Sequence, residues 1–328
     1  MSKVVKFRDI GGPEQLHIIE EDVGDPGPGE VRIKIKAIGI NRAESLYRSG
    51  KYFEQPILPS KLGYEAAGIV EAIGADVDEF KIGDVVSVIP NFSFHDYGFY
   101  GDTALARATS LVKHPENLSF EEAASVWMAY LTAYDALIGT AKLSKGEIVL
   151  IPAASSSVGL ASIQLANLIG AVPVALTRTS EKKNLLLSAG AAHVIATDEQ
   201  DIAAEVRRIS HGAGFQVLFD PVGGPAFATL LEVAAPRARI LLYGTIGEPT
   251  VIPHFPVFTK MLTITGALLF TTTSDPDKLK VGVDWVLRGL ESGALKPVIA
   301  KTFPLDQISD AHRYMESNKQ FGKIVVTV

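Results

Sequence analysis

The hydrophobic pattern changes near residue 119, and the change separates two kinds of predicted secondary structure. From Val4 to about His114, short apolar runs alternate with polar positions, and turn sequences such as Asp25-Pro26-Gly27-Pro28-Gly29 separate them. This alternation predicts strands with one buried face, so the segment is expected to be all-β. Ser119, followed by two glutamates, predicts the start of an alanine-rich helix that runs through Trp127.

Between Glu147 and about Leu269, short apolar runs alternate with helical patterns. Fully apolar runs are typical of strands in a parallel sheet with helices on both faces, so the expected fold class is α/β with a doubly wound sheet. An amphipathic helix that ends at Gly293 and a strand from Lys323 to Val328 follow. The expected strands of the sheet are Ile148 to Ile151, Val172 to Leu176, His193 to Ala196, Val217 to Phe219, Ile240 to Tyr243 and Leu262 to Leu269.

Length and composition narrow the classes of protein. A chain of 328 residues is long enough for two domains, and 47% hydrophobic with 21% charged residues is ordinary for a globular protein, which excludes disordered and fibrous classes. The net charge of -6 makes nucleic acid an unexpected partner. The absence of cysteine excludes disulfides, thiolate catalysis and cysteine zinc sites.

Neither the start of the chain nor its apolar runs suggest a membrane or a secretory route. Met1 to Asp9 mixes charged residues into its apolar ones, unlike a secretory signal. No apolar run approaches the ~20 residues of a membrane span. The sequence therefore predicts a soluble, cytoplasmic protein without a membrane partner.

The strongest local motif joins the run from Ile148 to Ile151 to a helix that ends at Gly170, through a turn of small residues. This order is typical of a dinucleotide site, where backbone N–H groups and the positive helix end face a pyrophosphate. The candidate cofactor-binding residues of the turn are Ser155, Ser156, Ser157, Val158 and Gly159.

The glycine fingerprint of such sites is incomplete, because Ala154, Ser156 and Gly159 occupy its three positions. Gly159 would keep the close packing of helix against strand. At Ser156, either the loop is wider than usual or its hydroxyls donate to phosphate. Two alternatives stay open: a turn that only packs, and a degenerate site that has lost its nucleotide.

The end of the second strand predicts which nucleotide would bind. An NAD site carries an acidic residue there, but this chain continues Thr177-Arg178-Thr179-Ser180. Arg178 and Lys182 are suited to a 2′-phosphate, which favours NADPH, and Thr179 would add a hydroxyl donor. Ser180 would add another, or would be the N-cap of a solvated helix.

Several ordered motifs, read together, carry a resemblance that covers essentially the whole chain. They are Gly39-Ile-Asn41-Arg-Ala-Glu-Ser-Leu-Tyr47, Leu62-Gly-Tyr64-Glu65-Ala-Ala-Gly68, Lys81-Ile-Gly-Asp-Val85, Leu131-Thr132-Ala-Tyr134, Asp220-Pro-Val-Gly-Gly224 and Gly322-Lys-Ile-Val325. With them the chain resembles the medium-chain dehydrogenase/reductase family, specifically its zinc-free quinone oxidoreductase branch.

The resemblance implies a domain organisation and an activity. A GroES-like, β-rich catalytic domain would comprise residues 1–123 and 269–328, and a Rossmann NADP(H)-binding domain residues 124–268, with the active site in the cleft. Similar proteins transfer a hydride from NADPH to quinones or to the activated double bond of enones and enals. They are usually homodimers or homotetramers.

Two zinc ligands of related alcohol dehydrogenases are missing. The position of their first cysteine falls in Gly39-Ile-Asn41, and Tyr64 replaces the histidine of their Gly-His-Glu motif. No pair of histidines has a spacing that would build a substitute, so the chain is expected to work without zinc. Hydrogen-bond donors would then stabilise the enolate or hydroquinone anion that hydride transfer creates.

Two residues are catalytic candidates by resemblance and a third by its position. Asn41 would contact the substrate or the nicotinamide ribose, and Tyr64 would face the space that the metal leaves. Tyr52 lies in the loop after Gly50. The alternatives are that both phenols only pack and that Asn41 is a turn residue before a helix.

Further cofactor-binding candidates lie outside the turn. Thr132 aligns with a residue that approaches the nicotinamide in similar enzymes, unless it is simply a threonine within a helix. Gly223 and Gly244 follow predicted strands, at the edge where open α/β sheets bind ligands, although either would also serve as a turn glycine. Lys323 would reach the cofactor, or be a surface lysine.

Aromatic residues are dense in the loop from Pro90 to Gly101. They predict an apolar wall over the substrate, packing beneath a long loop, or an oligomer contact. Phe255, Phe258 and Phe270 pose the same choice, and Phe270 is also a cofactor-binding candidate. If these side chains line a site, the substrate is a small apolar carbonyl compound or quinone.

The sequence therefore predicts an NADPH-dependent oxidoreductase in which Asn41 and Tyr64 orient a carbonyl oxygen. An enoyl reductase for acyl or polyketide substrates needs the same kind of site and stays open as an alternative. So does a non-enzymatic, nucleotide-binding protein with a structural or RNA-associated role, although the acidic charge balance disfavours RNA.

Overall fold

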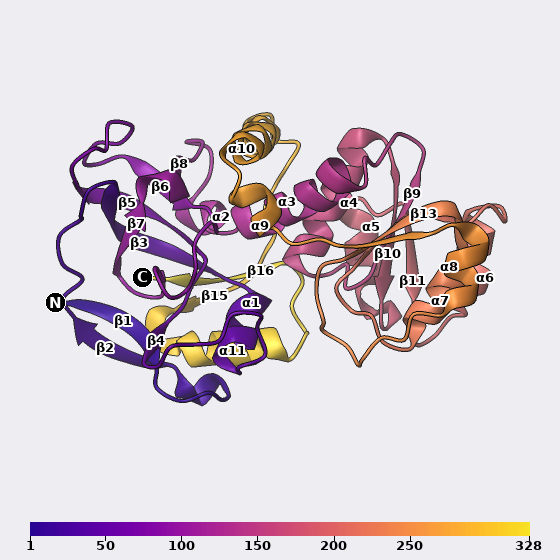
Figure 1. Cartoon of the computed structure of the whole chain (residues 1–328), viewed down its shortest axis with the longest axis horizontal. Helices are drawn as coiled ribbons and strands as arrows, with labels where there is room; N and C mark the ends of the chain where they lie inside the picture. Colours follow the sequence, from indigo (N-terminus) through magenta and orange to yellow (C-terminus); the bar gives the residue numbers. More distant parts are fainter. The chain divides into compact units, whose positions relative to one another are not determined.

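The computed structural model describes all 328 residues, which form two compact units. Unit 1 comprises Met1–Met128 and Lys296–Val328, and unit 2 comprises Ala129–Leu295. Figure 1 draws unit 1 in indigo, purple and yellow, and unit 2 from magenta to orange. None of the helices is both long enough and apolar enough to cross a membrane.

Unit 1 is built on a seven-stranded sheet of order β15-β16-β3-β5-β6-β8, with β7 also paired to β3. A separate three-stranded sheet has the order β2-β1-β4. All pairs are antiparallel except β15 with β16. The β-rich first segment is thereby confirmed. The strands are β1 (Ser2–Phe7), β2 (His17–Glu21), β3 (Glu30–Ile40), β4 (Ser60–Lys61), β5 (Glu65–Ile73), β6 (Val85–Val88), β7 (Thr103–Arg107), β8 (Leu111–Lys113), β15 (Ile299–Pro304) and β16 (Lys323–Thr327).

The helices of unit 1 are short. They are α1 (Arg42–Arg48), α2 (Phe120–Ala123) and α11 (Ile308–Glu316). Ser119 caps α2, and its side chain accepts a hydrogen bond from the Glu122 amide at 3.2 Å, as the sequence predicts. The helix does not continue through Trp127, because α2 ends at Ala123 and α3 (Trp127–Ala133) begins after a break. The break leaves the amide of Met128 free to donate to Glu65 Oε1 at 3.2 Å.

Unit 2 is a six-stranded sheet of order β11-β10-β9-β12-β13-β14 in which every pair is parallel. Because the strand order reverses direction at β9, right-handed crossovers place helices on both faces, which is the expected Rossmann arrangement. The strands are β9 (Ile148–Ile151), β10 (Val172–Thr177), β11 (His193–Ala196), β12 (Phe215–Asp220), β13 (Ala234–Leu242) and β14 (Thr263–Gly266). The helices are α4 (Ser157–Ile169), α5 (Lys183–Ser188), α6 (Ile202–Ile209), α7 (Ala226–Glu232), α8 (His254–Lys260), α9 (Phe270–Thr273) and α10 (Pro276–Glu291).

Helices α9 and α10 belong to unit 2, whereas the sequence predicts residues 269–328 as part of the catalytic domain. They pack against the π-helical turn Tyr134–Thr140. Thr272 Oγ1 donates to Asp135 Oδ1 at 2.5 Å, and the ring of Trp285 lies 5.5 Å from that of Tyr134. An amphipathic pattern shows that a helix buries one face, but it does not show which domain receives that face.

Candidate functional site

The predicted phosphate turn lies at the carboxyl end of β9, where Ser156 is the N-cap of α4. Its hydroxyl accepts a hydrogen bond from the Gly159 amide at 3.1 Å. A Cβ on Gly159 would lie 2.6 Å from both the Cα and the carbonyl oxygen of Ala154, so the close contact of helix and turn requires glycine. The first-turn amides of Ser157 and Val158 have no carbonyl within the helix to bond, which leaves donors for an anion.

Gly223 and Gly244 follow β12 and β13, the next two strands on one side of β9. Gly223 has φ 65°, and its amide donates to the carboxylate of Asp220 at 3.1 Å. Gly244 is exposed, and a Cβ there would be 3.1 Å from the side chain of Pro221. Parallel strands end at one edge of a sheet, so these glycines lie at the same edge as the phosphate turn.

Tyr243 is a residue of this edge that sequence reasoning missed. Its ring stacks on Phe219 with centroids 3.9 Å apart, and its hydroxyl is buried. Burial raises the pKa of this phenol, so it stays protonated. Its place directly before Gly244 was the available signal.

The candidate 2′-phosphate residues follow β10. Arg178, Thr179 and Ser180 are exposed, and Lys182 Nζ donates to Ser155 Oγ at 3.2 Å, which joins this segment to the phosphate turn. Ser180 is not a helix N-cap, because Thr179 occupies that position of the 3-10 turn Ser180–Lys182 and α5 begins only at Lys183.

A carboxylate does reach this segment, but from the end of a different strand. Glu199, which follows β11, accepts a hydrogen bond from the Ser180 amide at 2.9 Å. Hydrogen bonds from the backbone and side chain of Ser180 lower the pKa of Glu199, which keeps it ionised. Sequence reasoning looked for an acidic residue at the end of β10 alone and therefore missed it.

Thr132 and Phe270 are both half-buried in unit 2, in α3 and at the start of α9. Phe255 and Phe258 lie on α8 and are 77% and 80% exposed. Neither of these two phenylalanines packs in a core. Their exposure excludes packing beneath a loop, and the other two alternatives, an apolar wall over the substrate and an oligomer contact, stay open.

In unit 1, three strands bring Asn41, Glu65 and Lys323 together. Gly39 of β3 is paired with Glu65, the first residue of β5. Ile324 of β16 is paired with Ile40, so Lys323 faces the position of Asn41. Lys323 Nζ donates to Asn41 Oδ1 at 2.6 Å and to Glu65 Oε2 at 2.5 Å. All three side chains are buried.

The hydrogen-bonding capacity of Asn41 is largely used within unit 1. Its Nδ2 donates to the carbonyl of Gly39 and to Glu44 Oε1, both at 3.2 Å, while Oδ1 accepts from Lys323. Both amide hydrogens are therefore engaged, and one lone pair of Oδ1 remains. Lys323 is not a surface lysine, and its ammonium is bound to Glu65 and Asn41.

Glu44 is a second residue that sequence reasoning missed, although its spacing from Asn41 is that of a capping box. Its carboxylate accepts hydrogen bonds from the amide of Asn41 at 2.5 Å and from that of Tyr64 at 3.0 Å. Burial raises the pKa of Glu44 to about 7, against the lowering effect of these bonds and of Lys323. Glu44 is therefore one titratable group that accepts hydrogen bonds from the backbone of both Asn41 and Tyr64.

The phenol of Tyr64 is buried, and the phenol of Tyr52 lies nearer to the solvent. The Tyr64 side chain is fully buried, with its ring 3.8 Å from that of Phe94, and Tyr52 is half-buried with its ring 6.4 Å from that of Tyr64. Each hydroxyl affects the pKa of the other. Burial raises the pKa of both, so both stay protonated and able to donate. Tyr52 is the one nearer to solvent.

The aromatic loop from Pro90 to Gly101 packs beneath its own chain. Phe92, Phe94, Phe99 and Tyr100 are each no more than 4% exposed. Phe92 lies against Tyr64, with ring centroids 5.6 Å apart. The structure thus favours packing over an exposed apolar wall for most of these residues, and the loop supports the buried tyrosine.

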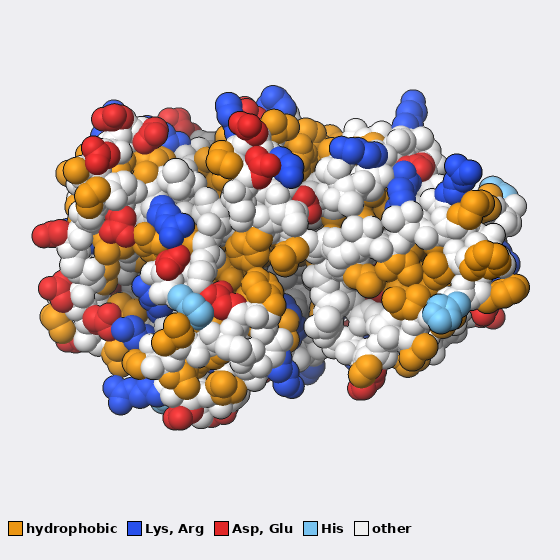
Figure 2. All heavy atoms as spheres, viewed as in Figure 1, with side chains coloured by type: hydrophobic (Ala, Val, Ile, Leu, Met, Phe, Trp, Pro, Cys, Tyr) orange, Lys and Arg blue, Asp and Glu red, His pale blue; other side chains and the backbone are white.

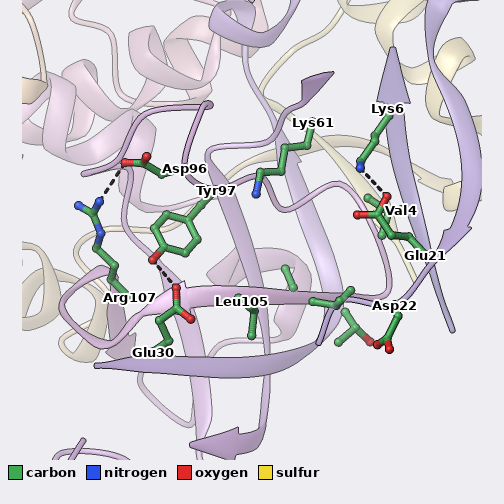
Figure 3. A pocket seen from close by; sticks show the side chains of 14 residues that line it. Val4, Lys6, Glu21, Asp22, Glu30, Lys61, Asp96, Tyr97, Leu105 and Arg107 are labelled. Atoms are coloured by element: carbon green, nitrogen blue, oxygen red, sulfur yellow. Dashed lines mark hydrogen bonds and ion pairs between the residues drawn. The ribbon is translucent and has the colours of Figure 1, made fainter. Parts of the chain in front are cut away.

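A polar pocket of about 320 Å³ opens elsewhere on unit 1 (Figure 3). Ion pairs between Lys6 and Glu21 and between Arg107 and Asp96 cross its lining, and Tyr97 donates to Glu30 at 2.6 Å. None of the predicted site residues lines this pocket. No three His, Asp or Glu side chains anywhere in the chain come together in a group that would hold a metal ion.

Comparisons with known proteins agree with this fold. Residues 27–116 match the alcohol dehydrogenase GroES-like domain family, and residues 157–288 match the zinc-binding dehydrogenase family. A quinone oxidoreductase of Pseudomonas aeruginosa is 32% identical to the chain, over 99% of both proteins. A 2-haloacrylate reductase of a Burkholderia species is 31% identical, over 96% of both.

A solved structure extends the similarity to the whole tertiary fold. The Escherichia coli quinone oxidoreductase, crystallised with NADPH, has a TM-score of 0.92 and 30% sequence identity, with 99% of this chain and 100% of that chain covered. The expected pairing of a GroES-like domain with a Rossmann-type domain is confirmed. Similarity of this extent covers both units, so the chain belongs to the quinone oxidoreductase branch of the medium-chain dehydrogenase/reductase family.

Proposed function

We propose that this oxidoreductase transfers a hydride from NADPH to quinones or to the activated double bond of enones and enals, and that it does so without zinc. The observation that carries the proposal is the pair of protonated phenols, Tyr52 and Tyr64, of which Tyr64 occupies the position where related enzymes hold a metal ligand. A phenol offers a hydrogen bond to an oxyanion that forms as the hydride arrives. The relatives named quinone oxidoreductase and 2-haloacrylate reductase support the two substrate classes.

The ammonium beside Asn41 argues against a divalent cation at the oxygen of this side chain. The ammonium of Lys323 lies 2.6 Å from Asn41 Oδ1 and would repel one. Neither Asn41 nor the phenol of Tyr64 belongs to the ligand types that dominate protein zinc sites. The phenols of Tyr52 and Tyr64 are hydrogen-bond donors, which suits reactions whose product anion is resonance-stabilised.

The residues of unit 2 fit NADPH. The amides that begin α4 and the glycine-lined edge suit a pyrophosphate, while Arg178 and Lys182 supply cations for a 2′-phosphate. The E. coli relative with bound NADPH supports this choice. Glu199 opposes it by charge, and its bond to Ser180 would also hold the loop in place. When bound, the reduced nicotinamide supplies the hydride.

The roles of the catalytic candidates follow from their free hydrogen-bonding groups. Tyr52 is the half-buried donor, so we assign it to the oxygen of the substrate, with the buried ring of Tyr64 beside it, the two ring centroids 6.4 Å apart. Asn41 has no amide hydrogen to spare, so it suits a hydroxyl group that donates to Oδ1, such as a ribose hydroxyl. This revises the expectation that Asn41 orients a carbonyl oxygen.

The surface of unit 2 favours association with a second copy of the chain. Strand β14 is an edge of its sheet, and apolar side chains of the adjoining α8 region are exposed: Val251, Phe255, Phe258 and Met261 are between 57% and 80% accessible. Figure 2 shows hydrophobic side chains gathered over α8. An exposed apolar area of this kind beside an unpaired strand edge favours a homodimer.

The first test is a fluorescence titration with NADPH and, separately, NADH, followed by turnover assays with quinones and enones. We expect NADPH to bind more tightly, and we expect Tyr52→Phe to lower kcat by about 100-fold while NADPH affinity is kept. Metal analysis of the active protein is expected to find no zinc. Preference for NADH would contradict the 2′-phosphate assignment, and one equivalent of zinc would contradict the mechanism.

A further inference from the structure

The ion pair between Lys323 and Glu65 is buried, with side-chain accessibilities of 1% and 0%. Removing two charges from water costs several kcal/mol per ion, and buried pairs can often be replaced by apolar residues without loss of stability. Stability alone is therefore a poor reason for a charged pair at this position. Its contacts suggest a different reason, because the same ammonium also holds Asn41.

The neighbouring backbone is adapted to this lysine. Lys323 begins β16, and its stem crosses β3 at Gly39. A Cβ on Gly39 would lie 2.8 Å from Lys323 Cε and 1.9 Å from the carbonyl oxygen of Ala124. The glycine thus opens the path by which the ammonium reaches both Glu65 and Asn41. The second oxygen of Glu65 is held by the amide of Met128, which fixes the carboxylate in turn.

The contacts of Asn41 admit one orientation of its carboxamide. An ammonium only donates, so the atom facing Lys323 must be the oxygen. A backbone carbonyl only accepts, so the atom facing Gly39 must be the nitrogen. Without Lys323, the oxygen would lose a charge-assisted bond, and rotation of the amide would cost less.

We propose that Lys323 and Glu65 are positioning residues, which hold the Asn41 carboxamide so that the remaining lone pair of its oxygen faces the bound reactants. This inference rests on the proposed function, in which Asn41 contacts those reactants. It replaces the expectation that Lys323 binds the cofactor directly. The residues act as a chain in which Glu65 fixes Lys323 and Lys323 fixes Asn41.

The test uses the double variant Lys323→Met/Glu65→Gln, which removes both charges of the pair together, so that neither is left buried without its partner. We expect kcat to fall by roughly 10- to 100-fold, because small displacements of a positioning group have effects of that size. We expect Asn41→Ala to cause a loss at least as large, and adding it to the double variant to cause little further loss. The matched control is Lys113→Met/Asp84→Asn, which removes an ion pair of the same unit whose lysine is 52% and aspartate 11% exposed, and which should keep wild-type kcat.

A second measurement needs no turnover. In protein labelled with 15N-asparagine, the side-chain amide of Asn41 should exchange its hydrogens slowly, unlike that of exposed Asn184, and the double variant should lose this protection. Fast exchange in the wild type would overturn the inference even if the variant failed to fold. Losses of kcat that multiply, or a double variant within twofold of wild type, would also overturn it. If the wild type reduces neither quinones nor enones, the proposed function fails, and the exchange measurement then decides the inference alone.

Discussion

Substitution of Gly159 by alanine tests how the turn and α4 form the nucleotide site. The added Cβ would lie 2.6 Å from Ala154 Cα and carbonyl oxygen, about 0.8 Å short of the 3.4 Å at which ordinary contact begins. Both opposing atoms belong to the backbone, so no side chain can rotate away. The start of α4 must move instead, together with the amides that we assign to the pyrophosphate.

The magnitude follows from the cost of overpacking, which is about 1–3 kcal/mol. If the added methyl destabilises the NADPH complex more than the free protein by this amount, NADPH affinity should drop by roughly 5- to 150-fold, at 1.4 kcal/mol for each factor of ten. If the added methyl instead lowers the free energy of unfolding, Tm should decrease by about 2–4 °C for each kcal/mol. The assays are the fluorescence titration and thermal unfolding of the same preparations.

Gly139→Ala is the matched control, because it also adds a methyl to a helical glycine of unit 2. Its Cβ would meet Asp135 and Tyr134 at 3.7 Å, an ordinary contact distance, so affinity and Tm should stay close to wild type. If Gly159→Ala binds NADPH with wild-type affinity and unfolds at the temperature of this control, the reasoning from close packing is refuted.

Three further predictions concern charge and association. The double variant Arg178→Ala/Lys182→Ala should bind NADPH about 10- to 100-fold more weakly in titrations, while its affinity for NADH stays near wild type. The control Lys183→Ala should keep wild-type affinity for NADPH. Equal loss of affinity for both nucleotides would contradict a 2′-phosphate site. The pKa of Glu44 is raised from 4.5 to about 7, so its contribution favours the folded state below pH 4.5 and is lost as pH rises to 7. Glu44→Gln should remove about 3 kcal/mol of that pH dependence in urea unfolding, and an unchanged pH profile would argue against the shift. Phe258→Glu should convert a dimer into a monomer in light scattering after size exclusion, whereas a wild-type monomer would exclude the proposed interface.

The sequence by itself determined the features that depend on neighbours along the chain. The turn between β9 and α4, the cap at Ser119 and the strands of the parallel sheet arise from local hydrogen bonding, local sterics and the periodicity of apolar residues. The ordered motifs also carried the family resemblance. Such signals are readable because each one involves residues close together in the sequence.

Contacts between residues that lie far apart in the sequence could be determined only from the tertiary structure. Lys323 and Asn41 are 282 positions apart, and the register of β16 with β3 brings the ammonium to the amide. Glu199 reaches Ser180 from the end of another strand. Helices α9 and α10 pack on unit 2 because Thr272 donates a hydrogen bond to Asp135 and the ring of Trp285 contacts that of Tyr134. The chemistry of Lys323 depends on whether its ammonium faces water or a buried carboxylate, and that is set by strand pairing rather than by any pattern along the chain.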